Sequence, residues 1–512
     1  MQLVAYGAQD VYLTGSPQIT FFKVVYRRHT NFSMESIEQT FNGTADFGKR
    51  VTCTISRNGD LIHRVYLQVT LPAVTCPDEC DTKCRNNCFR WVNYVGHALI
   101  RSVEVEIGGQ KIDKHYGDWL NIWNELTQEA GKQVGYDNMV GNTIALTGAA
   151  LSHTEAETLY VPLQFWFCRN PGLALPLIAL QYHEVKINLE FRNKEELYVV
   201  CPGFDRQGPC PTGCGKTVCV PSLQAASLYV DYIYLDTNER RRFAQTSHEY
   251  LIEQLQFTGD ESVNTRNVKI KLNFNHPCKA LFWVVQRNQN IVMEDNCGNV
   301  LLLNQWNNYT DDVDRDCSNC PPYCGSNVEG GHMARSFPWV SAGANGRCDP
   351  CNTGGCNSAA PGGCKIKAPS DLAAALNANT NDGVFNNEGG LADHAYGNAP
   401  VCAGRNPVVR AKLQLNGHDR FSERLGSYFN LVQPYQHFTN VPATGINAYS
   451  FGLSPVEHQP SGTCNFSRID SAVLQLQLTG NAVCGGAKVR VYATNYNVLR
   501  IMSGMGGLAY AN

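Results

Sequence analysis

Four cysteines in the second half of the chain have the spacing of a structural zinc site. Cys317 and Cys320 form one C-x-x-C pair, and Cys348 and Cys351 form a second. Four thiolates from two such pairs can enclose a tetrahedral Zn²⁺. Disulfides or free thiols would explain the same residues, and we favour them, with zinc as the alternative. Three more cysteines share this stretch, namely Cys324, Cys356 and Cys364.

Cysteine is abundant in the whole chain, with 22 residues, and unevenly distributed. Outside the stretch above, eight fall in two short segments, at Cys76, Cys80, Cys84 and Cys88 and at Cys201, Cys210, Cys214 and Cys219. Disulfides are rare in proteins that stay in reducing compartments. A protein that is made in a reducing compartment and later exposed outside the cell could form disulfide cross-links at that later stage. A particle that leaves its host cell meets that condition.

Several short motifs could indicate catalysis, but each lacks the context that its chemistry requires. Gly504–Ala509 matches G-x-G-x-x-A, yet only three residues follow, so we expect no helix that could hold a pyrophosphate. Gly213–Thr217 resembles the end of a phosphate-binding loop that lacks its first glycine. His183 and His248 each precede a glutamate, but no second histidine follows four residues later, as a zinc protease needs. We expect no enzymatic activity and no cofactor.

Four N-x-S/T sequons are present, at Asn31, Asn42, Asn308 and Asn465. Such sequons accept N-linked glycans on exposed loops. Asn308 opens a long region without strand pattern, whereas the other three lie in turn-like and strand-like sequence. Asn308 is therefore the candidate for glycosylation.

The charge composition argues against direct binding of nucleic acid. The formal net charge is −3, and only 17% of the residues are charged, against roughly 25% in typical soluble domains. Proteins that coat nucleic acid usually concentrate a basic excess on one face. The densest basic run is Arg240–Arg242, directly after Glu239. We expect a solvated or subunit-contact turn there, with phosphate binding as the alternative.

No segment has the pattern of a signal peptide or of a membrane span. Residues 1–23 lack a basic region followed by a continuous apolar one. The longest apolar run, residues 173–180, is interrupted by Pro176 and is too short to cross a bilayer. We expect synthesis in a cytoplasm, a soluble product and no transmembrane segment.

Alternation of apolar and polar residues dominates the chain. Val65, Leu67, Val69 and Leu71 alternate with polar or aromatic residues, and the same period recurs at 103–107, 185–191, 268–274, 474–478 and 489–493. Half-buried antiparallel strands have this period of two. Many short strands between Gly, Pro and Asn turns predict an all-β protein of sandwiches or jelly rolls.

Helical periodicity is scarce. Asp118 is a plausible N-cap for a helix with apolar residues at 119, 122, 123 and 126, and we expect this apolar stripe to cover a barrel end. Residues 371–376, after Ser370, are a second and shorter candidate.

An internal repeat indicates two copies of one β unit. Residues 37–43 (IEQTFNG) have a counterpart at 252–259 (IEQLQFTG), and residues 107–112 (IGGQKI) have one at 415–420 (LNGHDR). The order of the paired segments is the same in both halves, as expected for a duplication. The copies would join near residues 236–245.

The length of 512 residues also favours two or three domains. We predict an N-terminal arm at 1–24, a first β unit at 25–236 and a second at 237–512. The second carries a Gly-, Asn- and Cys-rich insertion at about 304–400. Insertions of this length in compact proteins are usually functional or disordered, and the cysteines favour an ordered surface tower.

Long segments of both halves resemble one known family. The chain is similar to the double jelly-roll major capsid proteins of nucleocytoplasmic large DNA viruses, especially those that infect algae. The segments that carry the resemblance are Tyr6–Gly15, Gln18–Lys23, Tyr26–Arg28, Ser56–Leu61, Gly108–Tyr116, Pro171–Val185, Asp231–Gly259, Gln459–Asp470 and Asn495–Asn512. The Cys-bearing insertions are the main parts left unmatched.

The resemblance implies two tandem eight-stranded antiparallel jelly rolls with long loop insertions and few short helices. It further implies a homotrimer, a capsomer of six similar barrels that tiles the icosahedral shell of a large double-stranded DNA virus. The arm up to about Lys23 would then face the interior. Expected partners are neighbouring capsomers, minor capsid proteins and, through the loops, a host cell surface. The protein would be assembled in the host cytoplasm and reside in the virion.

Two rival interpretations remain open at this point. A minor capsid paralogue at special positions of the shell would share the motifs, and the Cys-rich insertions favour it. A carbohydrate-binding adhesin sandwich, from another functional class, would need an exposed aromatic platform and no obligate trimer.

Overall fold

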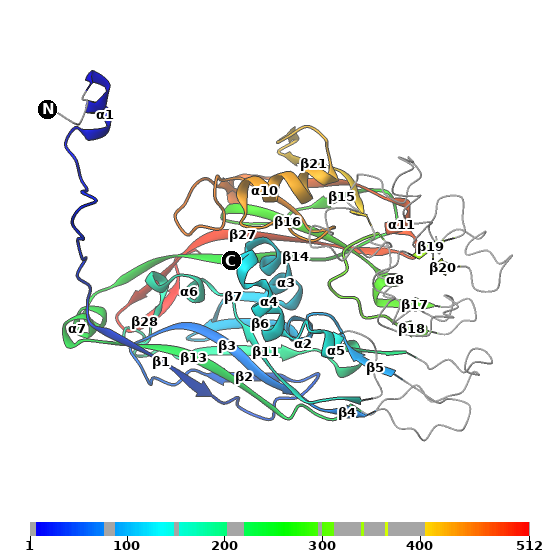
Figure 1. The fold of residues 1–512 in the computed structure, drawn as a ribbon, viewed down its shortest axis with the longest axis horizontal. Helices are drawn as coiled ribbons and strands as arrows, with labels where there is room; N and C mark the ends of the chain where they lie inside the picture. The colour runs from blue at the N-terminus through cyan, green and yellow to red at the C-terminus, as the bar shows by residue number, and fades with distance from the viewer. Residues whose placement is uncertain are drawn as a thin grey trace.

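The computed structural model of the chain describes residues 7–75, 88–147, 153–201, 220–294, 300–311, 339–341, 364–366 and 405–510. Two β sandwiches of the same design lie side by side (Figure 1), and an N-terminal arm projects away from them. The expected all-β fold of two tandem antiparallel jelly rolls is confirmed.

The first jelly roll consists of two antiparallel sheets around one core. One sheet has the order β1-β13-β3-β10, with β9 also paired to β3, and the other has the order β2-β11-β6-β7. The strands of the first sheet are β1 (Phe32–Gln39), β13 (Ala225–Leu235), β3 (Leu61–Leu71), β10 (Leu175–Pro176) and β9 (Glu157–Pro162). Those of the second are β2 (Arg50–Thr54), β11 (Val185–Phe191), β6 (Ile100–Ile107) and β7 (Gln110–Tyr116).

The second jelly roll repeats this strand order. Its sheets are β14-β27-β16-β24, with β25 beside β16 and β28 beside β27, and β15-β26-β21-β22, with β23 beside β21. The first comprises β14 (His248–Val263), β27 (Ala487–Met502), β16 (Pro277–Arg287), β24 (Asn447–Ser450), β25 (Cys464–Asn465) and β28 (Met505–Leu508). The second comprises β15 (Asn267–Lys271), β26 (Ala472–Leu478), β21 (Val408–Leu415), β22 (His418–Asp419) and β23 (Arg424–Leu425).

Alternating sequence produces these strands as expected. In β3, Val65, Leu67, Val69 and Leu71 are buried, whereas the residues between them are partly exposed. Successive side chains of a strand point to opposite faces, so an alternating segment buries one face in the core. Each jelly roll has its own core of such residues.

The internal repeat corresponds to equivalent structural positions. Residues 37–39 and 252–259 lie in β1 and β14, which are the first strand of each roll and pair with the equivalent strands β13 and β27. The second pair of repeats forms the hairpins β6–β7 and β21–β22. Both turns have two central residues with positive φ, Gly108 and Gly109 at 59° and 85° and Asn416 and Gly417 at 51° and 80°. Type I′ turns require these conformations, which explains Gly and Asn there.

Short strand pairs and short helices complete the fold. The pairs are β4 (Val74–Thr75) with β8 (His153–Thr154), β5 (Cys88–Trp91) with β12 (Tyr198–Cys201), β17 (Val292–Glu294) with β18 (Val300–Leu302) and β19 (Trp339–Ser341) with β20 (Cys364–Ile366). The helices are α1 (Val11–Thr14), α2 (Val95–Leu99), α3 (Gly117–Thr127), α4 (Gln133–Val140), α5 (Ile144–Thr147), α6 (Trp166–Arg169), α7 (Thr237–Gln245), α8 (Asn288–Ile291), α10 (Gln433–His437) and α11 (Gly480–Val483). None of the described helices is long and apolar enough to cross a membrane.

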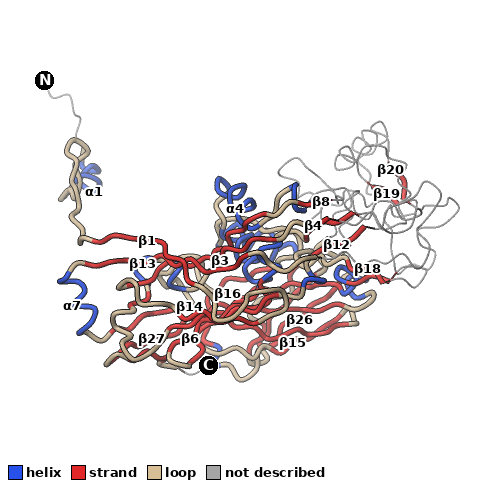
Figure 2. Tube along the Cα trace, turned by 90° about the horizontal axis from the view of Figure 1, so that it is seen from below, coloured by secondary structure: helices blue, strands red, loops and turns tan. Residues whose placement is uncertain are grey.

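Helix α7 connects the two rolls and contains the basic run Arg240–Arg242, for which the expected turn was wrong. Asp236 caps it by accepting hydrogen bonds from the backbone N–H groups of Asn238 and Glu239 at 3.1 and 2.9 Å. Arg240 pairs with the buried Asp60 of β3's leading turn at 3.0 Å. Capping and pairing both favour a helix over a turn. In both views α7 lies at the base of the N-terminal arm (Figures 1 and 2).

The prediction of a helix with Asp118 as its N-cap was only partly correct. Residues 117–127 form helix α3, but its N-cap is Tyr116 and Asp118 lies inside the first turn. The stripe does not cover a barrel end. Its tryptophans pack against β16 and β27 of the other roll instead. The predicted helix at 371–376 lies outside the described residues.

Candidate assembly surfaces

An aromatic cluster between the two rolls joins them into one block. Trp119 and Trp123 of α3 belong to the first roll and pack with Phe282 of β16 and Tyr492 of β27. The ring of Trp119 lies 5.1 Å from that of Phe282 and 5.6 Å from that of Tyr492. All four side chains are at most 5% exposed. Buried aromatic pairs add attraction beyond their buried area, so this contact resists separation of the rolls.

A buried ion-pair network also connects the two rolls, across the boundary between them. Arg490 of β27 donates from Nη1 to Asp118 of α3 at 2.5 Å and from Nε to Asp260 at 2.8 Å. Burial alone would lower the pKa of Arg490, but the two carboxylates raise it above its ordinary value. Asp260 in turn has a lowered pKa, because the hydrogen bond and charge of Arg490 outweigh its burial. The network is therefore charged in the folded protein.

A second network is centred on Glu253 of β14. Arg169 of α6, in the first roll, donates to Glu253 at 3.0 Å, and Lys279 of β16 donates at 2.7 Å. His458 lies 3.7 Å from the same carboxylate. Burial acts to raise the pKa of Glu253, but the hydrogen bonds and charges of these partners lower it. Sequence reasoning missed both networks, since their members are far apart in the chain.

These contacts give the molecule two equivalent halves in a fixed relative position. Charge pairs that are buried and hydrogen-bonded tolerate little rearrangement, because a lost partner leaves an uncompensated charge. Backbone contacts add to them: the N–H of Leu255 donates to Asp113 Oδ1 at 3.0 Å.

The N-terminal arm exposes large apolar side chains. Residues 7–31 run from the base of the sandwiches to α1 and lie away from the body (Figure 2). Tyr12, Phe21 and Phe22 are 92, 87 and 98% exposed, and five more apolar residues of the segment are at least 71% exposed, namely Leu13, Ile19, Val24, Val25 and Tyr26. Large apolar side chains exposed together along one segment mark an interaction site.

A second exposed feature is a row of tyrosines on the outer face of the first roll. Tyr66 of β3 stacks on Tyr229 of β13, with ring centres 5.3 Å apart and planes 4° apart. Tyr160 of β9 extends the row, 6.2 Å from Tyr66. The neighbouring strand β1 is the edge of this sheet and carries mainly exposed side chains. Amphipathic aromatic side chains on an outer face are typical of protein interfaces.

The structure shows where most of the catalysis-like sequence motifs lie. Gly504–Ala509 overlaps the hairpin β27–β28, not a strand-to-helix turn. The ring of His183 contacts the backbone of Gly506 at 3.0 Å, and that of His248 contacts the Phe243 carbonyl at 2.8 Å. Both histidines therefore have structural partners. The residues 213–217 lie outside the described part of the chain.

The four candidate zinc ligands Cys317, Cys320, Cys348 and Cys351 also lie outside the described residues. Within the described part, no group of three or more His, Cys, Asp or Glu side chains could hold a metal ion. Four free thiols are present there, at Cys53, Cys168, Cys278 and Cys464, and Cys484 is disulfide-bonded.

Asn308 lies in a described turn before the insertion. Its Nδ2 donates to Gln305 Oε1 at 2.9 Å, and its Oδ1 accepts from the Thr310 hydroxyl at 2.7 Å. The side chain is half-buried. A glycan would take one of the two hydrogens of Nδ2 and leave one N–H for the hydrogen bond to Gln305.

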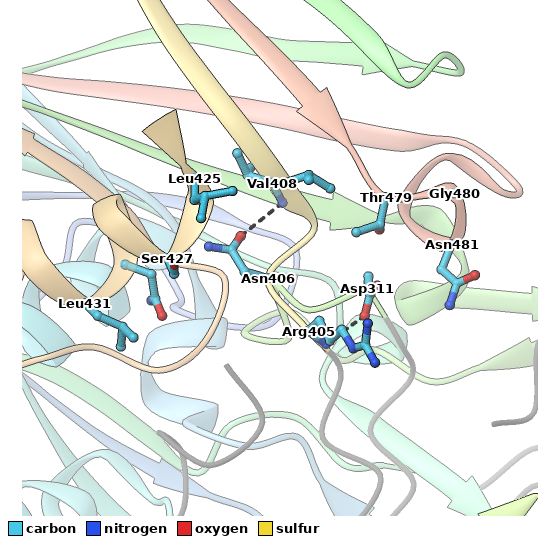
Figure 3. Close-up of a pocket in the computed structure, with 13 residues that line it drawn as sticks. Asp311, Arg405, Asn406, Val408, Leu425, Ser427, Leu431, Thr479, Gly480 and Asn481 are labelled. Carbon is cyan, nitrogen blue, oxygen red and sulfur yellow. Dashed lines mark hydrogen bonds between the residues drawn. The ribbon is translucent and has the colours of Figure 1, made fainter. Parts of the chain in front are cut away.

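A pocket of about 310 Å³ lies where the chain leaves and re-enters the second roll (Figure 3). Asp311 Oδ1 accepts a hydrogen bond from the Arg405 backbone at 2.7 Å, and Asn406 Oδ1 accepts one from that of Val408 at 3.0 Å. The Asp311–Arg405 hydrogen bond joins the two ends of the insertion, whereas the Asn406–Val408 hydrogen bond is local to the second end.

Comparison with known proteins decides the family. Residues 20–236 match the family model for the N-terminus of major capsid proteins, and residues 239–507 match that of the large eukaryotic DNA virus major capsid protein. The chain belongs to the major capsid proteins of large eukaryotic DNA viruses. Members of this family are structural components of the virion and not enzymes.

Relatives and solved structures agree with this assignment over the full length. The major capsid protein of Phaeocystis pouchetii virus is 54% identical over 100% of this chain and 99% of its own. That of Paramecium bursaria Chlorella virus 1 is 40% identical over 100% and 99%. A quasi-atomic model of the PBCV-1 virus capsid matches with a TM-score of 0.62 at 35% identity, covering 96% of this chain and 100% of that chain. The Faustovirus major capsid protein shares the fold, with a TM-score of 0.65 at 13% identity over 97% and 94%.

Proposed function

We propose that three copies of this capsid protein associate into a capsomer of six similar jelly rolls, which tiles an icosahedral shell. The observation that carries the proposal is the fixed side-by-side position of two rolls with the same strand order. A trimer of such chains has a near-hexagonal outline but needs only threefold symmetry and one gene.

The exposed features supply candidate contacts for this assembly. The tyrosine row and the open edge at β1 belong to the first roll, and the apolar arm is the segment that leads into it. Permanent interfaces bury on the order of 2,000 Å² or more and are more apolar than transient ones. We assign the tyrosine row to contact with a second copy of the chain. The arm is assigned to the capsomer base, against neighbouring capsomers and minor capsid proteins.

The two ends of the molecule differ, which supports one orientation in the shell. The arm and α7 lie at one end, whereas the ends of the insertion, near β18, lie at the other (Figure 1). If the arm faces the interior, the insertion faces outwards, where it would meet a host cell surface. Synthesis and assembly in the host cytoplasm complete the proposal.

Native mass spectrometry of the purified chain tests the trimer. We expect a species of three times the 56.6 kDa chain mass. A monomer at high concentration would contradict the proposal. Deletion of residues 1–24 tests the arm separately, because the arm makes no part of either core. The truncated chain should keep its unfolding temperature but fail to form shells, and normal shells would show that the arm is dispensable.

Two modifications are proposed from the sequence pattern. Asn308 is proposed as a glycan acceptor, and the mass of its proteolytic peptide from virions is the test. Cys317, Cys320, Cys348 and Cys351 are proposed as disulfides or free thiols, with zinc as the alternative. Metal analysis of the purified protein separates these, since one equivalent of zinc per chain would favour the metal site.

A further inference from the structure

Two free thiols of the second roll face each other across an antiparallel ladder. Cys278 of β16 and Cys464 of β25 are direct register partners. Neither forms a disulfide in the structure. Cys278 is fully buried and Cys464 is half-buried, and both pack in the core of the second roll.

The backbone spacing of this pair suits a disulfide. The N–H of Phe466 donates to the carbonyl of His276 at 3.1 Å, which makes these two residues a hydrogen-bonded pair of the ladder. Hydrogen-bonded pairs recur at every second residue, so Cys278 and Cys464 occupy the next one, with an expected Cα separation of about 5.5 Å. Disulfides usually span Cα separations of about 4.4 to 6.8 Å. Opposite residues of a ladder also project from the same face.

The two sulfurs are close enough to influence each other's charge. Burial raises the pKa of Cys278, and the neighbouring Cys464 raises it further. Burial also raises the pKa of Cys464. Since the thiolate is the reactive form, both thiols react slowly at neutral pH. They should therefore survive folding as thiols and oxidise later.

We propose that Cys278 and Cys464 form a reversible oxidation site that closes to a disulfide when the protein enters oxidising surroundings. The oxidant is a small disulfide such as oxidised glutathione. The thiolate of the more accessible Cys464 attacks it, forms a mixed disulfide and releases one glutathione thiolate. The thiolate of Cys278 then attacks the Cys464 sulfur and releases the second. Two protein thiols are oxidised, one small disulfide is reduced, and the two released thiolates take up the two protons.

The bond would anchor a weakly paired segment to a central strand. Strand β25 is only two residues long and ends the loop 451–463, whereas β16 pairs with β27 along most of its length. The closed loop runs from 278 to 464 and includes the insertion. Cross-links that close long loops give the largest entropic stabilisation in the chain-entropy account.

Differential alkylation of the full-length protein tests the proposal. The protein is incubated with reduced or oxidised glutathione, quenched, denatured, alkylated and digested without reduction. After oxidation we expect the peptides of Cys278 and Cys464 to appear as one linked species. The unfolding midpoint should rise by roughly 5 °C or more. Full alkylation of both cysteines after oxidation, or linkage of either to another cysteine, would overturn the assignment.

Two variants separate this bond from other oxidation events. Cys464→Ser should abolish the linked species and most of the gain in midpoint. Cys53→Ser is the matched control, because Cys53 is a buried free thiol on β2 that faces Ile187 rather than a cysteine. Cys53→Ser should retain both effects, and an equal loss in the two variants would contradict the proposed pair. These readouts do not depend on capsomer assembly.

Discussion

Arg490 and Asp118 form an ion pair between the two jelly rolls, with Nη1 and Oδ2 2.5 Å apart and both side chains largely buried. Asp118→Ala would leave the guanidinium with Asp260 as its nearest carboxylate. We expect the free energy of unfolding to fall by about 3 to 5 kcal/mol, as is typical when one partner of a buried pair is removed. Scanning calorimetry of the purified protein measures this change.

An exposed ion pair of the same chemistry provides the control for Asp118→Ala. Arg500 Nε lies 2.8 Å from Glu249 Oε1, and both side chains are more than half exposed. Solvent screens such pairs, so Arg500→Ala should cost at most about 1 kcal/mol. Equal losses in the two variants would show that the Arg490–Asp118 pair between the rolls is not buried in solution.

The aromatic cluster should contribute as much as the ions. Trp119 is fully buried between Phe282 and Tyr492. Trp119→Ala removes these contacts and leaves a cavity, so we expect a loss of about 3 to 5 kcal/mol in chemical denaturation. Leu453→Ala, at a side chain that is 74% exposed, should change stability by less than about 0.5 kcal/mol. A loss below 1 kcal/mol for Trp119→Ala would argue against the packed boundary.

Acid should destabilise the protein through His97. Burial lowers the pKa of this imidazole from 6.5 to about 3, and Tyr136 lies at 2.8 Å from its Nε2. The unfolded chain therefore binds a proton that the folded chain rejects. The stabilisation is complete above pH 6.5 and declines as the pH falls towards 3, by about 1.4 kcal/mol per pH unit.

Urea denaturation between pH 7 and 4.5 measures this dependence. His97→Gln should flatten the slope in that window. Carboxylates with a lowered pKa, such as Glu253, lose their contribution only below their ordinary value of 4.5. An unchanged slope in His97→Gln would assign the acid sensitivity to other groups.

Substitutions at the two glycines of the hairpin β6–β7 distinguish the cost of backbone strain from the cost of a steric clash. A Cβ at Gly109 would meet nothing within 4 Å, but φ is +85°, so Gly109→Ala should cost about 1 to 2 kcal/mol. A Cβ at Gly108 would lie 2.3 Å from the His183 ring as well, so Gly108→Ala should cost more. Gly131→Ala, with open space and no positive φ, should be nearly neutral. Thermal unfolding should show the largest loss of stability for Gly108→Ala, a smaller loss for Gly109→Ala and almost none for Gly131→Ala. A larger loss for Gly109→Ala than for Gly108→Ala would be inconsistent with the turn.

The sequence by itself determined the strands, the duplication and the family. Alternation in segments such as Val65–Leu71 reports which face of a strand is buried, because side chains of a strand point to opposite faces. The repeated Gly-Gly and Asn-Gly turns are equally local, since positive φ at two adjacent residues restricts the residue types. These signals need only a few neighbouring residues, and they were sufficient for the fold.

Tertiary structure alone decided how the two rolls are joined and which thiols face each other. Asp118 and Arg490 are separated by 372 positions, so no local pattern could reveal their pairing. For the same reason the local sequence predicts Asp118 as an N-cap, whereas its carboxylate pairs with Arg490 of the other roll. Cys278 and Cys464 likewise become partners only through the ladder of β16 and β25. Contacts between distant segments depend on the complete packing of both cores, which a one-dimensional pattern does not contain.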